Sequence, residues 1–198
     1  MSKLWPYATP GIPDKRFQQL PGIPLTQRDV RLLVMGSLRL KANAQLWDIG
    51  AGTGTVTIEA ALLCPQGQIT AVERDEEVAG LIKTNCDRFE VSNVDVIVGN
   101  APNCLNHIKG TPDCILIEGA PLQSTLETAW EKLALQGRIV VTAHNLETLY
   151  TASETFAALH VRNIEVAQPA VNRLTTRGNR QVFAAVDPIF IISGDKLE

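Results

Sequence analysis

Three closely spaced glycines are the part of the sequence with the most specific chemistry. They lie in the segment Asp48-Ile-Gly-Ala-Gly-Thr-Gly54, between a strand-like run and a stretch with helical periodicity. Glycine allows positive φ and a close approach of the backbone to a ligand, and the next helix begins with free N–H donors. The spacing is G-x-G-x-G, whereas a dinucleotide-binding loop has G-x-G-x-x-G. The segment predicts a cofactor loop and disfavours a nicotinamide cofactor.

Acidic side chains end two of the predicted strands. Glu73 closes the run Thr70-Ala-Val-Glu73, where a carboxylate beside a glycine loop can accept both hydroxyls of a ribose. NAD-binding folds use the same device, so Glu73 alone does not identify the cofactor, and a solvated charge is its alternative. Glu118 follows the run Cys114–Ile117. It can orient or protonate a substrate, or it is an exposed loop acid.

His144 is a further candidate for an acid or base. It follows the strand-like run Arg138–Thr142 and is the histidine nearest to a strand end on the expected ligand side. Histidine exchanges protons near neutral pH, which suits general acid and base catalysis. The sequence has no Ser-His-Asp or Cys-His pattern, so it predicts no covalent triad.

Three arginines lie close together near the C-terminus, at Arg173, Arg177 and Arg180. Arginine pairs with carboxylates in a bidentate way, so these side chains are candidates for binding an acidic substrate. A solvated loop rich in arginine is the alternative. Further cations lie in or near the N-terminal segment, at Lys15, Arg16, Arg28 and Arg31.

These residues lie among short β-branched runs that alternate with helix-length segments, which predicts an α/β fold. Parallel strands need crossover connections, so helices should cover both faces of a mostly parallel sheet. The strands expected are Gln45–Ile49, Gln68–Val72, Val94–Val98, Cys114–Ile117 and Arg138–Thr142. The helices expected are Thr55–Leu63, Glu76–Phe89, a short one after Pro102, Leu122–Leu135 and Leu146–Leu159.

The two ends of the chain depart from this alternation. Val161–Val171 and Gln181–Ile192 are strand-like runs that should pair as an antiparallel hairpin around the loop Asn172–Arg180. Residues 1–25 form a proline-rich arm, and its apolar side chains favour packing on a surface over a frayed tail. Residues 26–198 are expected to be one domain. It begins with a helix over Gln27–Leu40, where Thr26-Gln-Arg-Asp29 resembles a capping box with Asp in place of Glu.

Composition narrows the class of protein. The chain has 198 residues, 45% of them apolar, and a net charge of −3, so a disordered or fibrous chain is excluded. This charge disfavours a nucleic-acid partner, and no run is apolar enough to span a membrane, so we expect a cytoplasmic protein. The cysteines lack zinc-site spacing, so no metal site is expected and their thiols should be buried and inert.

The loop from Asp48 to Gly54 resembles that of the class I S-adenosylmethionine methyltransferases, which have a Rossmann-like fold with a seven-stranded, mostly parallel sheet and a C-terminal antiparallel hairpin. Three other stretches resemble one family within that class. They are Gly22-Ile-Pro-Leu-Thr-Gln-Arg-Asp-Val-Arg31, the segment from Gly137 to Glu147, and Asp187-Pro-Ile-Phe-Ile-Ile-Ser-Gly194. Together they are similar to the CbiT-type, decarboxylating precorrin methyltransferases of cobalamin biosynthesis, over almost the whole chain.

This resemblance implies a reaction. S-adenosylmethionine would methylate carbon 15 of a precorrin or cobalt-precorrin, with loss of carbon dioxide from the acetate at carbon 12. The tetrapyrrole carries several carboxylates, which the three C-terminal arginines would bind, and Glu118 or His144 would serve the decarboxylation. It also implies a homotetramer and a possible partner enzyme for methylation at carbon 5.

The resemblance also assigns a cofactor site. Thr26 closes over the cofactor, the glycine loop holds its amino-acid end, Glu73 holds the ribose, and Asn100 and Ala101 lie at the adenine. Relatives have Asp where this chain has Asn100, which weakens a role for charge there. The implied cofactor-binding set is Thr26, Asp48, Gly50, Ala51, Gly52, Thr53, Gly54, Glu73, Asn100 and Ala101.

Three alternatives remain at the level of sequence. Another class I methyltransferase would act on RNA, protein or a small molecule. However, the chain lacks both a strongly basic composition and the Pro-Pro-Tyr motif of several such enzymes. A non-catalytic cofactor-binding or assembly module is disfavoured by the intact loop from Asp48 to Gly54 and by Glu73. A nicotinamide-dependent reductase is disfavoured by the glycine spacing.

Overall fold

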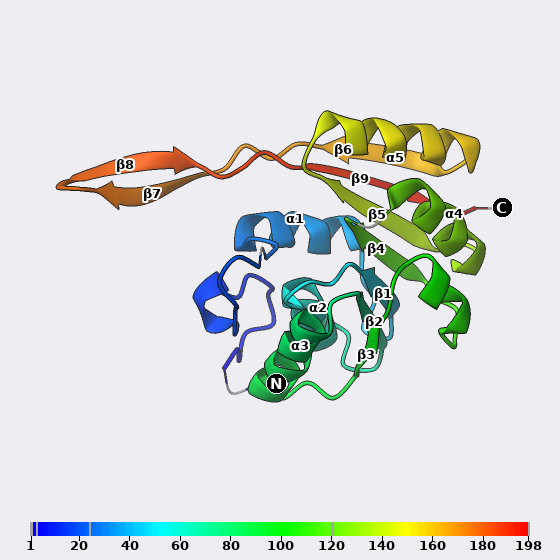
Figure 1. The fold of residues 1–198 in the computed structure, drawn as a ribbon, viewed down its shortest axis with the longest axis horizontal. Coiled ribbons are helices and arrows are strands. Elements are labelled where there is room, and N and C mark those ends of the chain that lie inside the picture. The colour runs from blue at the N-terminus through cyan, green and yellow to red at the C-terminus, as the bar shows by residue number, and fades with distance from the viewer. Residues whose placement is uncertain (1, 3, 24, 120, 198) are drawn as a thin grey trace.

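A seven-stranded sheet forms the centre of the computed structural model, which describes residues 2, 4–23, 25–119 and 121–197 (Figure 1). Its strand order is β3-β2-β1-β4-β5-β9-β6. The five strands from β3 to β5 run parallel, and β9 lies antiparallel between β5 and β6. The strands are β1 (Gln45–Ile49), β2 (Gln68–Glu73), β3 (Val94–Val98), β4 (Cys114–Glu118), β5 (Arg138–Ala143), β6 (Arg162–Ala167) and β9 (Phe190–Asp195).

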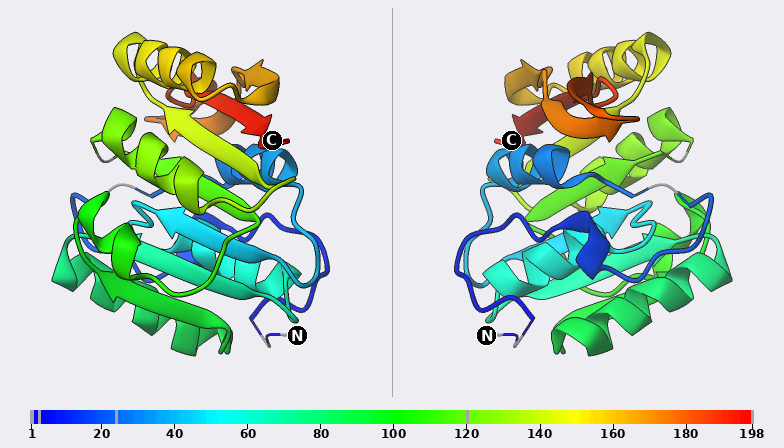
Figure 2. Two further views of the ribbon diagram at one scale, coloured as in Figure 1. Left: turned by 90° about the vertical axis from the view of Figure 1, so that its right-hand side faces the viewer. Right: turned by 90° about the vertical axis from the view of Figure 1, so that its left-hand side faces the viewer.

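Helices cover both faces of this sheet, as the alternation of segments predicted (Figures 1 and 2). One layer holds α1 (Arg28–Leu38), α2 (Thr55–Leu63) and α3 (Glu76–Phe89). The opposite layer holds α4 (Leu122–Lys132), α5 (Leu146–Ala158) and the short 3-10 helix η2 (Asn103–His107).

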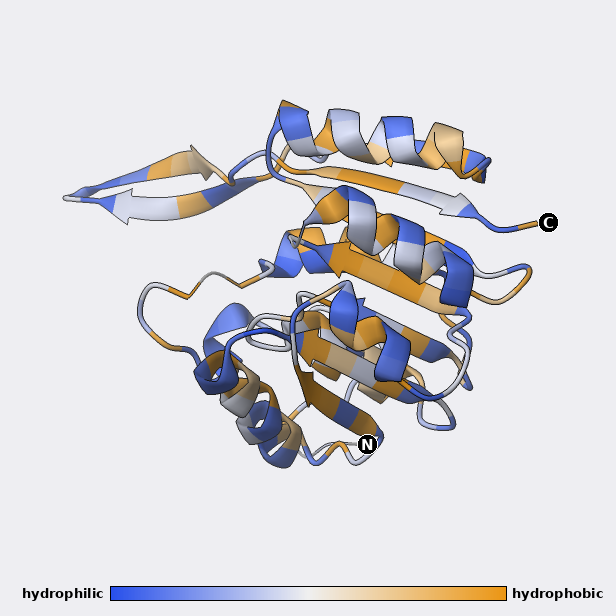
Figure 3. Ribbon diagram, turned by 45° about the vertical axis from the view of Figure 1, so that its right-hand side comes forward, coloured by the Kyte–Doolittle hydropathy of each residue, from blue (hydrophilic) through white to orange (hydrophobic). Residues whose placement is uncertain are grey.

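The sheet separates two apolar cores because successive side chains of a strand point to opposite faces. In β1, Leu46 packs with α1 and α2 in one core, and the adjacent Trp47 packs with α4 and α5 in the other. Both faces are therefore apolar, which matches the hydrophobic colour of the central strands in Figure 3. The strand-like runs are recognisable in the sequence for this reason.

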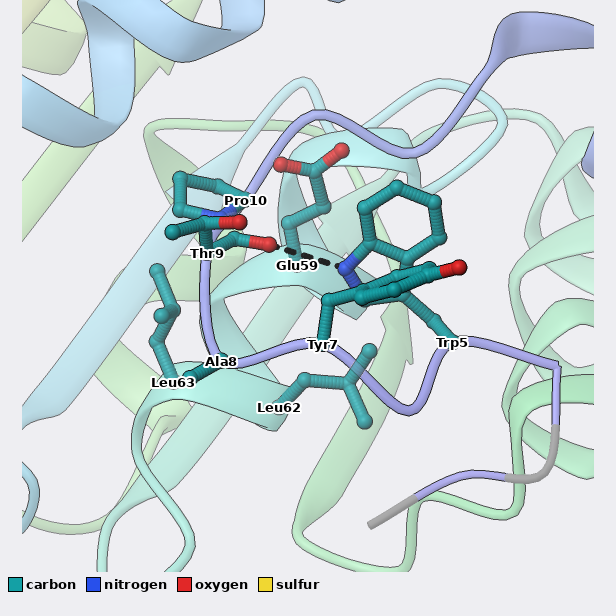
Figure 4. A pocket seen from close by; sticks show the side chains of 8 residues that line it. All are labelled: Trp5, Tyr7, Ala8, Thr9, Pro10, Glu59, Leu62 and Leu63. Atoms are coloured by element: carbon teal, nitrogen blue, oxygen red, sulfur yellow. Dashed lines mark hydrogen bonds between the residues drawn. The ribbon is translucent and has the colours of Figure 1, made fainter.

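The N-terminal arm lies against α2 and α3. Ile12 and Phe17 of the arm are buried in a cluster with Ile58 of α2 and Phe89 of α3. A 3-10 helix, η1 (Asp14–Arg16), turns the arm toward α1. Farther from the core, the Trp5 indole N–H donates to the carbonyl of Thr9 at 2.9 Å, and these residues fold over the surface of α2 (Figure 4).

The predicted loop over Asn172–Arg180 is wrong. This segment contains β7 (Asn172–Arg177) and the start of β8 (Arg180–Ala185), which pair with each other in a separate two-stranded sheet. The predicted antiparallel pairing is correct, since β6 also pairs with β9, but the hairpin is longer than expected. Beyond the core, backbone hydrogen bonds rather than apolar burial hold the strands together, so no apolar pattern marked β7.

The predicted capping box before α1 is also wrong. Gln27 occupies the N-cap position and makes no side-chain cap bond. The Thr26 hydroxyl donates to the Glu118 carboxylate, and Asp29 accepts from Arg173 in the hairpin. The two side chains that a capping box would use, Thr26 and Asp29, are therefore both engaged in tertiary hydrogen bonds. Pro24, which belongs to the same segment, lies outside the described residues.

The four cysteines were expected to be buried and inert. Cys64 and Cys114 are buried, while Cys86 and Cys104 are half-buried. Burial raises the pKa of all four thiols, which disfavours reactive thiolates.

Within the described part of the chain, no helix combines the length and apolar character needed to cross a membrane.

Candidate functional site

The glycine loop connects the carboxyl end of β1 to α2, and its backbone requires glycine. Gly50, Gly52 and Gly54 have φ of 82°, 54° and 77°. A Cβ atom on Gly50 would lie 1.8 Å from the carbonyl oxygen of Glu118, and one on Gly54 would lie 2.9 Å from Ile82. The loop is therefore compressed between β4 on one side and α3 on the other. Ala51 and Thr53, which separate these glycines, are both buried.

Asp48 is fully buried at the base of this loop. Its Oδ2 accepts a hydrogen bond from the Thr57 hydroxyl at 2.5 Å, whereas its Oδ1 has no partner among the described residues. Burial, with the nearby Glu118 carboxylate, raises the pKa of Asp48 to about 7. A buried carboxylate with one unpaired oxygen costs free energy, so the edge of the sheet is prepared for a donor or a positive charge.

Glu73 lies at the end of the neighbouring strand and is bonded to the loop. Its Oε2 accepts from the backbone N–H of Gly52 at 3.0 Å, and its Oε1 accepts from the N–H groups of Arg74 and Asp75. The carboxylate is half-buried and keeps free lone pairs toward solvent. The predicted proximity of Glu73 to the glycine loop is confirmed.

Asn100 and Ala101 follow β3 on the same edge. The N–H of Gly99 donates to the carbonyl of Glu73 at 2.9 Å, which brings the two strand ends together. The Asn100 side chain is exposed, and Ala101 packs at the margin of the core beside Cys104. The edge therefore carries, in spatial order, the ends of β3, β2, β1, β4 and β5.

Glu118 is the acid at the end of β4 on this edge. Its carboxylate accepts from the Thr26 hydroxyl at 2.7 Å and from the Thr142 hydroxyl at 3.1 Å. Burial raises the pKa of Glu118, and these two hydroxyls, followed by His144 and Arg31, act in the opposite direction. Glu118 is half-buried, which rules out the exposed loop acid considered above.

Thr142 was missed by sequence reasoning. It is the register partner of Glu118 across β4 and β5, so the pairing of the two strands places its hydroxyl beside the carboxylate. The signal that could have identified it is a polar residue near the end of an otherwise apolar strand, next to a strand that ends in an acid. His144 lies two residues farther along and is exposed.

A buried ion pair between Arg31 of α1 and Glu59 of α2 holds the arm near Glu118. The Arg31 Nε and Glu59 Oε1 are 2.9 Å apart, and the two side chains are 0% and 1% exposed. Arg31 also donates to the carbonyls of Ile12 and Thr26, and Glu59 accepts from the backbone N–H groups of Gly11 and Ile12.

Sequence reasoning gave Arg31 a place among the cations of the arm and gave Glu59 none. The available signal was an acid inside the apolar segment Thr-Val-Thr-Ile-Glu-Ala-Ala-Leu-Leu, a position that burial makes costly unless a cation pairs with it. Through the Thr26 carbonyl, this pair fixes the residue whose hydroxyl binds Glu118. Glu59 also lines the pocket of Figure 4 together with Trp5 and Tyr7.

The three C-terminal arginines are not brought together at one place. Arg173, at the base of the hairpin, donates to Asp29 at 2.6 Å and to Asp14 at 3.3 Å. Arg177 and Arg180 face each other at the hairpin tip, which projects away from the body of the chain (Figure 1). Within one chain, therefore, Arg173 alone of the three lies near the arm and α1.

The sheet order and the glycine loop at the carboxyl ends of β1 and β4 define a class I methyltransferase fold. Residues 20–196 match the model of a family described as precorrin methyltransferase domain. The chain belongs to this family.

Relatives and solved structures agree with this assignment. The chain is 37% identical over 191 residues to a probable cobalt-precorrin-6B C(15)-methyltransferase (decarboxylating) of Sulfurisphaera tokodaii, which covers 94% of this chain and 98% of the relative. A structure of a precorrin-6y C5,15-methyltransferase from Geobacter metallireducens superposes with a TM-score of 0.87 at 32% identity, over 94% of this chain and 98% of that one. A precorrin 8W decarboxylase from Methanobacterium thermoautotrophicum superposes with a TM-score of 0.84 at 29% identity, over 92% and 98%.

Proposed function

We propose that this chain transfers a methyl group from S-adenosylmethionine to carbon 15 of a precorrin or cobalt-precorrin and decarboxylates the acetate at carbon 12, in cobalamin biosynthesis. Its membership of the precorrin methyltransferase family carries the proposal. The relative from Sulfurisphaera tokodaii, whose name states the same carbon and the decarboxylation, supports it over nearly the full length.

The residues of the edge fit S-adenosylmethionine. The unpaired Oδ1 of Asp48 lies at the base of a loop in which Gly50 and Gly54 leave no room for a Cβ. We assign the amino-acid end of the cofactor to Gly50, Ala51, Gly52, Thr53 and Gly54, with Asp48 beneath them. Glu73 would accept the ribose hydroxyls, and Asn100 with the N–H of Ala101 would meet the adenine.

When bound, the cofactor supplies an electrophilic methyl group on a positively charged sulfur. The nucleophile is an electron-rich carbon of the tetrapyrrole, so the protein needs to align the two atoms within about 3 to 3.5 Å and exclude water. Thr26 and Arg31 serve this purpose by holding the arm beside the loop and Glu118. No covalent intermediate on the protein is required.

Decarboxylation needs a proton for the carbon that loses carbon dioxide, and Glu118 is the candidate donor. The C–C bond of the acetate breaks, its electron pair passes into the conjugated macrocycle, and a proton restores the methyl group that remains. Burial raises the pKa of Glu118, which favours a protonated carboxyl that can donate. His144, exposed at the end of β5, is the second candidate.

The hairpin supports self-association. Leu174 and Phe183 face each other across β7 and β8, and they are 56% and 75% exposed. Exposed apolar side chains on paired strands of this kind mark contact surfaces, so we propose a homo-oligomer, a homotetramer by resemblance to the family. A separate methyltransferase would act at carbon 5.

Incubation with methyl-labelled cofactor and a panel of precorrins, with and without cobalt, tests the proposed function. We expect label to enter a tetrapyrrole and carbon dioxide to be released from the same substrate. Label that enters RNA or protein, and no tetrapyrrole, would contradict the proposal.

A further inference from the structure

A charged cleft opens beside the arm, outside the cofactor edge. Its volume is about 260 Å³, and Pro13, Asp14, Lys15, Arg28 and Arg173 line it. Three separate elements meet there: the 3-10 helix of the arm, the first turn of α1 and the base of the β7–β8 hairpin. The lining residues thus come from distant parts of the sequence.

Cations exceed acids around this cleft. Asp14 and Asp29 are the acids, and both accept from Arg173, while Asp29 also lies 3.4 Å from the Nε of Arg28. The Lys15 side chain is exposed and has no bonded partner among the described residues. The Nη2 of Arg173 is shielded from solvent and also lacks an acceptor there. Three cations against two acids leave the cleft with positive charge and unused donors.

The cleft lies next to the candidate active site. Arg28 follows Thr26 by two residues, and consecutive Cα atoms are about 3.8 Å apart, so the two Cα atoms lie within about 8 Å of each other. Thr26 donates to Glu118, and its carbonyl accepts from Thr55 at the start of α2. A large ligand at the cofactor edge therefore has its periphery within reach of Arg28.

We propose that this cleft binds a peripheral carboxylate of the tetrapyrrole, with Lys15 as the unpaired cation, Arg28 as an exposed cation in a long contact with Asp29, and Arg173 as a cation held in place by Asp14 and Asp29. This proposal rests on the proposed function, because a precorrin carries acetate and propionate side chains around its ring. It replaces the arginine set expected from the sequence, since Arg177 and Arg180 lie at the hairpin tip of the same chain.

Equilibrium binding of uroporphyrin, a tetrapyrrole with a carboxylate on every peripheral side chain, tests the cleft. The variants are Lys15→Glu and Arg28→Glu, alone and combined. Lys83→Glu on α3 and Arg162→Glu at the start of β6 are matched controls, because both side chains are exposed and neither lines the cleft. Binding of S-adenosylhomocysteine is measured in parallel.

We expect the combined variant to bind uroporphyrin at least about tenfold more weakly, with a smaller dependence on salt concentration than the wild type, because two attractions become repulsions. Its affinity for S-adenosylhomocysteine should stay within about twofold, which a loss of folding would not permit. The controls should match the wild type in both measurements.

Unchanged affinity for uroporphyrin in the combined variant, or an equal loss in the controls, would overturn the cleft assignment and leave the proposed function standing. A wild type that binds S-adenosylhomocysteine but not uroporphyrin would also overturn the cleft assignment. The proposed function is tested separately by methyl transfer from the wild type to a precorrin, and absence of that transfer would overturn both.

Discussion

The N-terminal arm and the β7–β8 hairpin both lie outside the layered core, but they are attached to it in different ways. The arm is bonded through a fully buried ion pair, Arg31 with Glu59, and buries Ile12 and Phe17 against α2 and α3. The hairpin makes its side-chain ion pairs to the body through Arg173, and it leaves Leu174 and Phe183 exposed.

This difference assigns different roles to the two additions. A segment held by buried charges has one position, so it can place Thr26 against Glu118 with the accuracy that catalysis needs. A hairpin with an exposed apolar face and little contact with its own core gains stability from another surface. We therefore propose that the arm, through the adjoining Thr26, completes the site of its own chain, and that the hairpin contacts a second copy.

The largest expected effect comes from breaking the attachment of the arm. Arg31→Met leaves the Glu59 carboxylate buried without its cation, with only the backbone N–H groups of Gly11 and Ile12 bonded to it, which should lower the free energy of unfolding by about 3 to 5 kcal/mol. Arg177→Met at the hairpin tip should change it by less than about 0.5 kcal/mol, because that side chain is exposed. Chemical denaturation of both variants measures the contrast. Equal losses would show that the arm is not specially anchored.

The second prediction concerns pH, which should affect the two regions differently. Residues 172–185 of the hairpin contain no acid, whereas the sheet edge near the arm contains Asp48. Burial raises the pKa of Asp48 from 3.8 to about 7. Between these values the unfolded chain releases a proton that the folded chain retains, so the free energy of unfolding falls as pH rises. Linkage sets about 4 kcal/mol as the upper limit of this effect.

Asp48→Asn removes this titration. The stability of the wild type relative to this variant should therefore decline from pH 4 to pH 7 and stay level above it. Denaturation series on both proteins give the difference at each pH. A difference that is constant with pH, or that grows, would contradict a raised pKa at Asp48.

The third prediction addresses the hairpin. Leu174→Ser with Phe183→Ser should weaken self-association by about 1.5 to 3 kcal/mol for each side chain that becomes buried between copies. Affinity for S-adenosylhomocysteine should stay within about twofold, since neither residue touches the cofactor edge. Analytical ultracentrifugation reports the oligomer. Unchanged assembly would mean that the exposed hairpin face is not a contact surface.

The smallest effect is expected at the link between the arm and Glu118. Thr26→Val removes one hydrogen bond to the carboxylate and should reduce kcat/KM by a factor of about five to ten, equivalent to about 1 kcal/mol. Thr142→Val removes the other bond from within the sheet and is the matched control. If Thr142→Val is impaired and Thr26→Val is not, the arm has no part in positioning Glu118.

The layered core was predictable from the sequence, whereas the contacts that attach the arm and the β7–β8 hairpin to it were not. Strands such as Gln45–Ile49 were placed correctly because both faces of the sheet are apolar, which produces continuous β-branched runs. The glycine loop could also be predicted. A position without room for a Cβ, such as Gly50, requires glycine, and a required glycine is visible in the sequence itself. These signals are local in the sequence.

The remaining features depend on contacts between residues far apart. Arg31 and Glu59 are 28 positions apart, and Thr26 and Glu118 are 92 apart, so no pattern in one segment links them. The capping box was predicted from local chemistry at Thr26, which a distant carboxylate outcompeted. In β7 the error came from polar residues that pair without a core beside them.

The central claim is that the loop from Asp48 to Gly54 binds a sulfonium nucleoside. Calorimetric titration of S-adenosylhomocysteine into the wild type and Gly50→Ala tests it most directly. We predict binding to the wild type and a loss of at least about a hundredfold in the variant, because the added Cβ would meet the Glu118 carbonyl oxygen at 1.8 Å. Equal binding by both proteins, or tight binding of a nicotinamide dinucleotide in its place, would contradict the account.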